Sequence, residues 1–172
     1  MILQTQRLTL RPLDPGDAGA LHALLSDAEV MAYWDISEIQ DEALTAKILD
    51  SQLTAMARDD SFHWAMMRNE DRAFIGCCDL SDIDRWHRRA EVGFISARAC
   101  WGQGYTLEAM RAVLDHAAQE LHLKRLAARV HLGNRRSIRL LKKLGFEAEG
   151  VLRGYVERDG ERRDCRLFGL LL

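Results

Sequence analysis

The chain has 172 residues, of which 48% are hydrophobic and 29% charged, and its formal net charge at pH 7 is −2. This length suits one full-sized core, so we expect a single domain over residues 1–172 with the composition of an ordinary globular protein. No apolar run approaches the roughly 20 residues of a membrane span, and the charged, alternating start of the chain has no signal-peptide core. We therefore expect a cytoplasmic protein without a membrane segment.

The first half of the chain predicts a strand, helical pieces and a hairpin. The alternation of apolar and polar residues indicates the first strand, and Asp14 opens a helix that ends near Ser26. A polar turn, Asn69-Glu70-Asp71, joins two further strands. The expected strands are Gln6–Leu13, Phe62–Arg68 and Ala73–Leu80, and the expected further helical pieces are Glu29–Asp35 and Ser37–Arg58.

The second half alternates strands and helices before it ends in a hairpin. Asn134 is a natural N-cap, Gly145 ends the helix that follows it, and Asp159-Gly160 is a hairpin turn signal between the last two strands. The expected strands are Ala90–Ser96, Leu126–His131 and Cys165–Leu172, and the expected helix between the first two is Tyr105–Glu120. Without repeats or linkers, the chain is predicted to be one mixed α/β unit.

Charge is distributed unevenly along the chain. Residues 1–60 carry eleven acidic residues against four basic ones, whereas residues 121–146 carry eight basic residues and no acidic one. This asymmetry suggests that one end of the molecule meets an anion and the other a cation. A solvated basic helix face is the alternative explanation of the basic stretch.

The four cysteines show no zinc-ligand spacing, so the sequence predicts no metal site. Cys77 and Cys78 are adjacent in an expected strand and should point to opposite faces. We therefore interpret Cys77, Cys78, Cys100 and Cys165 as reduced structural thiols.

Two glycines, Gly102 and Gly104, immediately precede the expected helix from Tyr105. The start of a helix exposes unpaired N–H groups and about half a positive charge, and glycine lets a phosphate approach that backbone closely. The pattern is neither a P-loop, because Tyr105-Thr106 replaces Lys-Ser/Thr, nor a dinucleotide fingerprint, because Leu107 replaces the third glycine. A structural loop is the alternative when the two glycines are considered alone.

The order of the surrounding blocks resembles the GNAT superfamily of acetyl-coenzyme-A-dependent N-acetyltransferases. It is particularly similar to the Rim-type branch, which the ribosomal-protein N-terminal acetyltransferases typify. The resemblance covers essentially the whole chain. Its blocks are TQRLTLRPLDPGD (Thr5–Asp17), FIGCCDL (Phe74–Leu80), AEVGFI (Ala90–Ile95), WGQGYTLEAM (Trp101–Met110), NRRSIRLLKKLGF (Asn134–Phe146) and the closing segment Gly150–Leu172.

The resemblance implies an α/β fold in which a strongly bent mixed sheet of about seven strands carries helices on both faces. Its central strands would splay apart around acetyl-CoA, with the pyrophosphate on the amides of Gly102–Thr106 and the pantetheine beside Gly93–Ser96. The helix after Asn134 would face the adenosine phosphates. The residues implied for cofactor binding are Phe94, Ile95, Ser96, Trp101, Gly102, Gln103, Gly104, Tyr105, Thr106, Asn134, Arg135, Arg136, Ser137 and Arg139.

The chain departs from the family pattern at a few positions. Ala99 stands where the general pattern has Gln or Arg, and Thr106 offers its hydroxyl one residue earlier than the Rim-type motif does. Leu141 stands where many members carry the tyrosine that protonates the leaving thiolate. The chain therefore needs a different proton donor.

Transfer of an acetyl group from a thioester to an amine needs a base, an oxyanion donor and an acid for the departing sulfur. The resemblance makes Glu91 the base, although a carboxylate paired with Arg88 or Arg89 is the structural alternative. Ser137 is the candidate acid, with an ordinary first-turn serine as its alternative. A backbone N–H near Phe94 or Ile95 is the expected oxyanion donor.

The acceptor is expected to be an amine that binds between segments flanking the cleft. Tyr33, Trp34, Trp64 and Trp86 are the predicted acceptor-binding residues, and Asp35, His63 and His87 are further candidates from the same segments. A core aromatic is the alternative explanation for Trp34. We favour a protein or peptide N-terminus over a small molecule such as a polyamine, aminoglycoside or amino acid.

Two other classes of function remain open at this point. A non-catalytic acyl-CoA-binding module is supported by Leu141 and opposed by the presence of Glu91 and Ser137. Nucleic-acid binding through residues 121–146 predicts a steep salt dependence, and the acidic overall balance disfavours it. The resemblance to the GNAT family is the only basis for expecting a homodimer.

Overall fold

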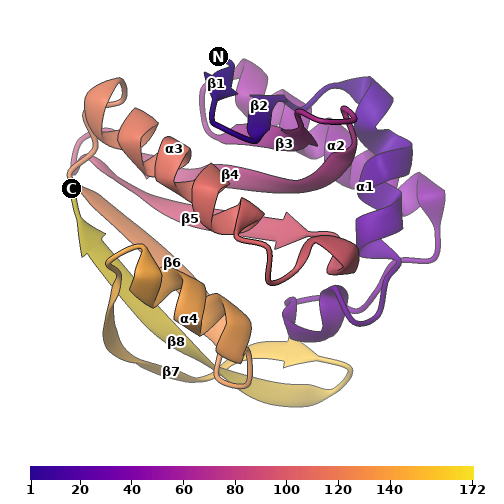
Figure 1. The fold of residues 1–172 in the computed structure, drawn as a ribbon. Helices are drawn as coiled ribbons and strands as arrows, with labels where there is room; N and C mark the ends of the chain where they lie inside the picture. Colours follow the sequence, from indigo (N-terminus) through magenta and orange to yellow (C-terminus); the bar gives the residue numbers. More distant parts are fainter.

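The computed structural model describes residues 1–172 as one eight-stranded sheet flanked by four α-helices (Figure 1). The strands lie in the order β1-β2-β3-β4-β5-β6-β8-β7, and only β5 and β6 are parallel neighbours. The strands are β1 (Leu3–Gln4), β2 (Leu8–Pro12), β3 (Phe62–Arg68), β4 (Phe74–Asp84), β5 (Arg89–Ser96), β6 (Arg125–His131), β7 (Glu147–Arg158) and β8 (Glu161–Leu171). The helices are α1 (Ala18–Leu25), α2 (Glu42–Ala57), α3 (Tyr105–Gln119) and α4 (Arg135–Lys143).

The sheet opens at its parallel pair of strands. The β5–β6 ladder consists of three pairs, from Arg89 with Arg125 to Glu91 with Ala127, and then stops. Beyond this point β5 pairs only with β4, and β6 pairs only with β8, so the two strands diverge as Figure 1 shows. The predicted mixed sheet with splayed central strands is confirmed, and it has eight strands where about seven were expected.

Two layers of helices cover opposite faces of the sheet. Cys78, Leu80 and Val92 lie in one core with residues of α3 and α4, whereas Cys77 and Ile95 lie in a second core with α1 and α2. Because side chains alternate along a strand, neighbouring residues of β4 and β5 enter different cores. Cys77 and Cys78 are thus on opposite faces, as predicted, and all four cysteines are buried free thiols.

The helical segments before β3 are shorter than the sequence predicts. The expected helix from Ser37 begins only at Glu42, because Asp41 caps it by accepting a 2.8 Å hydrogen bond from the N–H of Ala43. Met31–Tyr33 forms a single 3₁₀ turn where a helical piece over Glu29–Asp35 was expected. None of the helices is long and apolar enough to cross a membrane.

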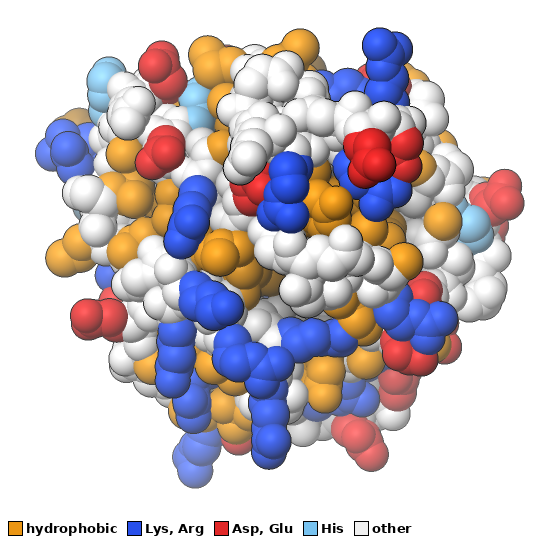
Figure 2. Space-filling model, viewed as in Figure 1, with side chains coloured by type: hydrophobic (Ala, Val, Ile, Leu, Met, Phe, Trp, Pro, Cys, Tyr) orange, Lys and Arg blue, Asp and Glu red, His pale blue; other side chains and the backbone are white.

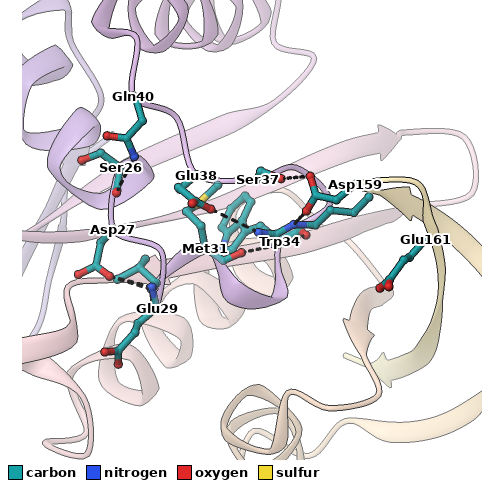
Figure 3. Close-up of polar contacts among 12 residues, drawn as sticks. Ser26, Asp27, Glu29, Met31, Trp34, Ser37, Glu38, Gln40, Asp159 and Glu161 are labelled. Carbon is teal, nitrogen blue, oxygen red and sulfur yellow. Dashed lines mark hydrogen bonds and ion pairs between the residues drawn. The ribbon is translucent and has the colours of Figure 1, made fainter.

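The β7–β8 hairpin holds this 3₁₀ turn from a distance of more than 120 residues along the chain. Arg158, only 8% exposed, donates hydrogen bonds to the carbonyl oxygens of Met31 (2.5 Å) and Trp34 (3.1 Å). Ser37 donates to Asp159 at the hairpin turn (2.5 Å), and Figure 3 shows these two residues joined by a dashed line beside Trp34. The segment that leads from α1 to α2 is therefore fixed to the far end of the sheet.

Replacing Arg158 with alanine is expected to lower the melting temperature, because the Trp34 carbonyl would lose its partner and the Met31 carbonyl would keep only the Trp34 N–H. An unpaired buried polar group costs about 1–3 kcal/mol, which corresponds to roughly 2–12 °C in a protein of this size. Arg162, on the next strand but 66% exposed, is the matched control, and Arg162→Ala should change the melting temperature by less than about 2 °C. Equal melting temperatures for the two variants, measured by circular dichroism, would contradict the anchoring role.

Candidate functional site

The divergence of β5 and β6 creates a cleft of about 700 Å³. Its walls are the free edges of these two strands, the start of α3, the inner face of α4 and the segment around the 3₁₀ turn. Most of the predicted site residues line this one cleft. They are Tyr33, Trp34, Glu91, Phe94, Ile95, Ser96, Trp101, Gly102, Gly104, Tyr105, Thr106, Asn134, Arg136, Ser137 and Arg139.

Four predicted residues do not line the cleft. Trp64 is 1% exposed and stacks on Phe62 in the core, with its indole N–H donating to the Met1 carbonyl, so it has no access to an acceptor. Trp86 is 90% exposed in the turn after β4 and is not among the residues that line the cleft. Gln103 and Arg135 belong to the expected loop and helix but do not reach the cleft.

The start of α3 is an open anion-binding surface. Gly102 and Gly104 have φ angles of +76° and +82°, which side-chain-bearing residues rarely adopt. Gly104 is the N-cap and supplies no side-chain hydrogen bond, so the first-turn N–H groups of the helix have no protein acceptor at the cap. A Cβ atom on Gly102 would project into open space, where a bound phosphate would otherwise approach.

Arg7 and Glu108 hold this glycine loop in place. Glu108, in the first turn of α3, accepts 2.7 Å hydrogen bonds from the Thr5 hydroxyl, the Arg7 N–H and the Arg7 guanidinium. Arg7 also donates to the Gln103 carbonyl (3.0 Å) and lies over the Tyr105 ring. Burial opposes ionisation of Glu108, but these hydrogen bonds outweigh it and lower its pKa.

Basic side chains of α4 face the start of α3 across the cleft, and the space between them is here called the phosphate region. The Arg136 guanidinium lies 3.2 Å from the centre of the Trp101 ring, and the Trp101 indole donates to the Ser96 carbonyl (3.0 Å). Arg139 and Lys143 line the same wall. Figure 2 shows the Lys and Arg side chains gathered over the region of α4. The basic stretch predicted from sequence thus faces the uncapped start of α3.

The first turn of α4 presents two polar side chains to the cleft. The Asn134 side chain caps the helix by accepting from the Ser137 N–H (3.1 Å), as predicted. The Ser137 hydroxyl lines the cleft and has no protein hydrogen-bond partner. Leu141 is fully buried in the core, so this position contributes nothing to the cleft.

A polar network crosses the sheet on the face opposite α3 and α4. Glu91 accepts from the Arg129 guanidinium (3.2 Å), which also lies 3.7 Å from Asp35, and His131 lies 3.0 Å from the other Asp35 oxygen. Glu91 therefore pairs across the strand gap with β6. The expected alternative partner Arg89 instead pairs with Asp84.

Asp79 is a cleft residue that the sequence analysis missed. It lies on β4, on the same face as Glu91, and its carboxylate occupies the space that a side chain on Gly93 would need. Burial, with the negative charge of Glu91 nearby, raises the pKa of Asp79 to about 6. A single carboxylate within the otherwise apolar run from Ile75 to Leu80 was the available signal.

The cleft suits acetyl-CoA. The uncapped start of α3, left open by the glycines, and the facing arginines match a diphosphate. The two strand edges have free backbone N–H and C=O groups, which match an extended chain that contains amides. The sulfur end would then lie among Glu91, Ser137 and the backbone of β5.

Comparison with known proteins agrees with this geometry. Residues 7–147 match the family model described as the acetyltransferase (GNAT) domain. The chain is 33% identical over 169 residues to the uncharacterized N-acetyltransferase p20 of Bacillus licheniformis, covering 98% of this chain and 95% of that protein. It is 30% identical over 156 residues to the spermidine N(1)-acetyltransferase of Escherichia coli K12, covering 91% and 81%.

A solved structure shows the same fold at low sequence identity. The RimL ribosomal L7/L12 α-N-protein acetyltransferase, in complex with coenzyme A, superposes with a TM-score of 0.91 and 18% identity, covering 100% of this chain and 98% of that one. This likeness shows the fold, whereas the family match and the curated relatives identify the activity class. The chain belongs to the GNAT family and is an acetyl-CoA-dependent N-acetyltransferase.

Proposed function

We propose that this enzyme acetylates the α-amino group of a protein or peptide N-terminus. The observation that carries the proposal is the separation of charge within one cleft. Arg136, Arg139 and Lys143 face the phosphate region, whereas the other end has three carboxylates, Asp35, Asp79 and Glu91, against Arg129 and His131. A polyanionic cofactor and a cationic amine therefore each have a complementary region, and the two regions meet at β5.

Acetyl-CoA supplies an activated acetyl group as a thioester. The amides of Gly102–Thr106 and the α4 arginines hold its phosphates, and the free edge of β5 between Gly93 and Ser96 holds the extended chain. A backbone N–H near Phe94 or Ile95 stabilises the charge that develops on the carbonyl oxygen. The backbone supplies this donor, so no side-chain substitution removes it.

Glu91 and Ser137 are the proposed acid–base pair. Glu91 accepts the proton that the amine loses when its nitrogen bonds to the acetyl carbon, while the ion pair with Arg129 fixes the position of the carboxylate. Ser137, whose hydroxyl is free of protein partners, donates a proton to the sulfur as the carbon–sulfur bond breaks and recovers one from solvent, to which Glu91 releases the proton that it took. No metal is needed for this sequence of proton transfers.

The basicity of the acceptor favours an N-terminus over a lysine side chain. An α-amino group with a pKa near 8 is roughly one-fifth neutral at pH 7.4, whereas a lysine with a pKa of about 10.4 is only ~0.1% neutral. One carboxylate already paired with an arginine is a modest base. An acceptor that is partly neutral at working pH therefore suits this site better.

A polyamine is the second candidate acceptor. The spermidine N(1)-acetyltransferase of Escherichia coli is 30% identical to this chain, and three carboxylates line the amine end of the cleft. The discriminating experiment is release of free coenzyme A over a panel of peptides and polyamines. We expect peptides to have the higher kcat/KM. Activity with polyamines alone would overturn the preference for an N-terminus.

Gly102→Ala is expected to raise the Kd of acetyl-CoA at least 10-fold, because its methyl group would occupy the phosphate approach. Gly160 is a matched control, since its φ of +78° resembles the +76° of Gly102 and its Cβ would also meet open space, but it lies in the β7–β8 turn. The two variants should lose similar stability, whereas Gly160→Ala should retain wild-type affinity. Equal Kd values by calorimetry would refute the proposed phosphate site.

Glu91→Gln is expected to lower kcat about 100-fold at pH 7, with the Kd of acetyl-CoA changed by less than about twofold, because it removes a proton acceptor and keeps the shape. The loss should shrink at pH 9, where an α-amino group is already neutral. Glu149→Gln is the control, because Glu149 also pairs with an arginine, Arg125, but lies outside the cleft. An unchanged kcat at pH 7 would remove Glu91 from the mechanism.

A further inference from the structure

A second, smaller pocket lies beside the cleft, toward α1 and α2. Trp34, Ile36, Asp79, Phe94 and Ile95 line both cavities, so only these side chains separate the two. The far wall consists of side chains from the two helices, among them Leu21, Leu25, Ile48 and Gln52. The pocket therefore lies on the sheet face that carries Glu91 and Asp79, away from α3 and the phosphate region.

The size of this pocket suits a compact group. Its volume is about 80 Å³. At about 10–15 Å³ for each water-sized position, this volume accommodates roughly five to eight non-hydrogen atoms. An aliphatic side chain as long as that of leucine or methionine fits this space. An indole is too large for it.

The pocket is apolar except at three side chains. Eight of its eleven lining residues are hydrophobic, and the polar ones are Gln52, His63 and Asp79. The Oε1 atom of Gln52 is buried without any hydrogen-bond partner, and such an atom is stabilised by a ligand that donates a hydrogen bond. Burial lowers the pKa of His63 to about 4, so this imidazole is neutral at pH 7.

Asp79 is the one carboxylate at the junction of the two cavities. Because Gly93 has no side chain, the Asp79 carboxylate lies against the backbone of β5, next to the strand edge proposed to hold the thioester. A protonated amine at this carboxylate would be close to both Glu91 and the reacting carbon. Groups attached to the amine would extend either into the small pocket or out along the cleft.

We infer that the small pocket binds the side chain of the first residue of the acceptor, while Asp79 at its mouth binds the α-amino group. This inference rests on the proposed function and names its substrate class: N-termini whose first side chain is compact and uncharged. Charged first residues are excluded. Asp79 already binds the α-amino group, so no carboxylate is left to neutralise a cationic side chain, and the apolar walls would strip an anionic side chain of water without a compensating partner. If the first residue carries a hydroxyl group, that hydroxyl can donate a hydrogen bond to the unpaired Oε1 atom of Gln52.

The inference is tested with peptides that differ only in their first residue, assayed by coenzyme A release. Ile48→Phe narrows the pocket, so we expect the KM of a leucine-starting peptide to rise at least 10-fold and that of a glycine-starting peptide to change less than twofold. Leu44→Phe is the matched control, because Leu44 is one turn earlier on the same helix but 45% exposed and outside the pocket lining. It should leave both KM values unchanged.

A second variant tests the buried oxygen without narrowing the pocket. Threonine and valine have the same shape and differ by one donor, so wild-type enzyme should prefer the threonine-starting peptide and Gln52→Leu should lower the threonine-to-valine ratio of kcat/KM about 10-fold. Gln119→Leu, on the exposed side of α3, is the control. An unchanged ratio in Gln52→Leu would overturn the role of Gln52.

The results of these experiments distinguish a failure of the pocket assignment from a failure of the proposed N-terminal acetylation. Coenzyme A release from the leucine-starting peptide with the same KM in wild type and Ile48→Phe would overturn the pocket assignment and leave N-terminal acetylation intact. No release from any peptide, by protein that binds acetyl-CoA in calorimetry, would refute the proposed acceptor class itself. Asp79→Asn should raise the KM of every peptide, whatever its first residue, and unchanged KM values would remove Asp79 from amine binding.

Discussion

The end of main-chain pairing between β5 and β6 after Glu91 is the constraint on which the site depends. Unpaired backbone groups are costly when buried, so two strands can separate in this way only if each stays bonded along its other edge and the gap remains open to water or a ligand. β4 and β8 meet the first condition by long antiparallel ladders. The gap is then both a structural break in the sheet and a row of free donors and acceptors for an extended cofactor.

This opening also separates the two substrates by face. α3 and α4 lie on one side of the sheet, where the uncapped helix start and the arginines are proposed to hold the phosphates. Glu91, Asp79 and Arg129 point to the other side, toward α1 and α2, because alternate residues of their strands enter the α3 core. In the proposed arrangement the anion and the amine approach from opposite faces and meet only at the strand edge, where Arg129 pairs with Glu91 and Asp35.

Sequence reasoning predicted what is local or carried by an ordered motif. The glycine loop, the Asn134 cap, the Asp159-Gly160 turn and the alternation of helices and strands depend on neighbouring residues, and they were identified. The contacts of Arg7 with Glu108 and of Arg158 with the 3₁₀ turn join residues about 100 positions or more apart, which no local pattern reports.

The same limit explains the errors at the acceptor end. The sequence shows that Trp64 and Trp86 are both large aromatic residues, but not that Trp64 is buried in the core and Trp86 is exposed in a turn. Asp79 was overlooked because a carboxylate in an apolar strand gains meaning only when its face of the sheet is known. The acceptor site therefore required the tertiary structure, whereas the proposed cofactor-binding residues followed from the ordered motifs that resemble the GNAT family.

The most direct test of this account is an amide ¹H–¹⁵N titration of the protein with coenzyme A. The account predicts the largest shifts at the amides of Gly102–Thr106, with further shifts along Gly93–Ser96, and a marked reduction of the first set when a pantetheine lacking the diphosphate replaces the cofactor. Saturable binding that leaves the amides of Gly102–Thr106 unmoved would contradict it.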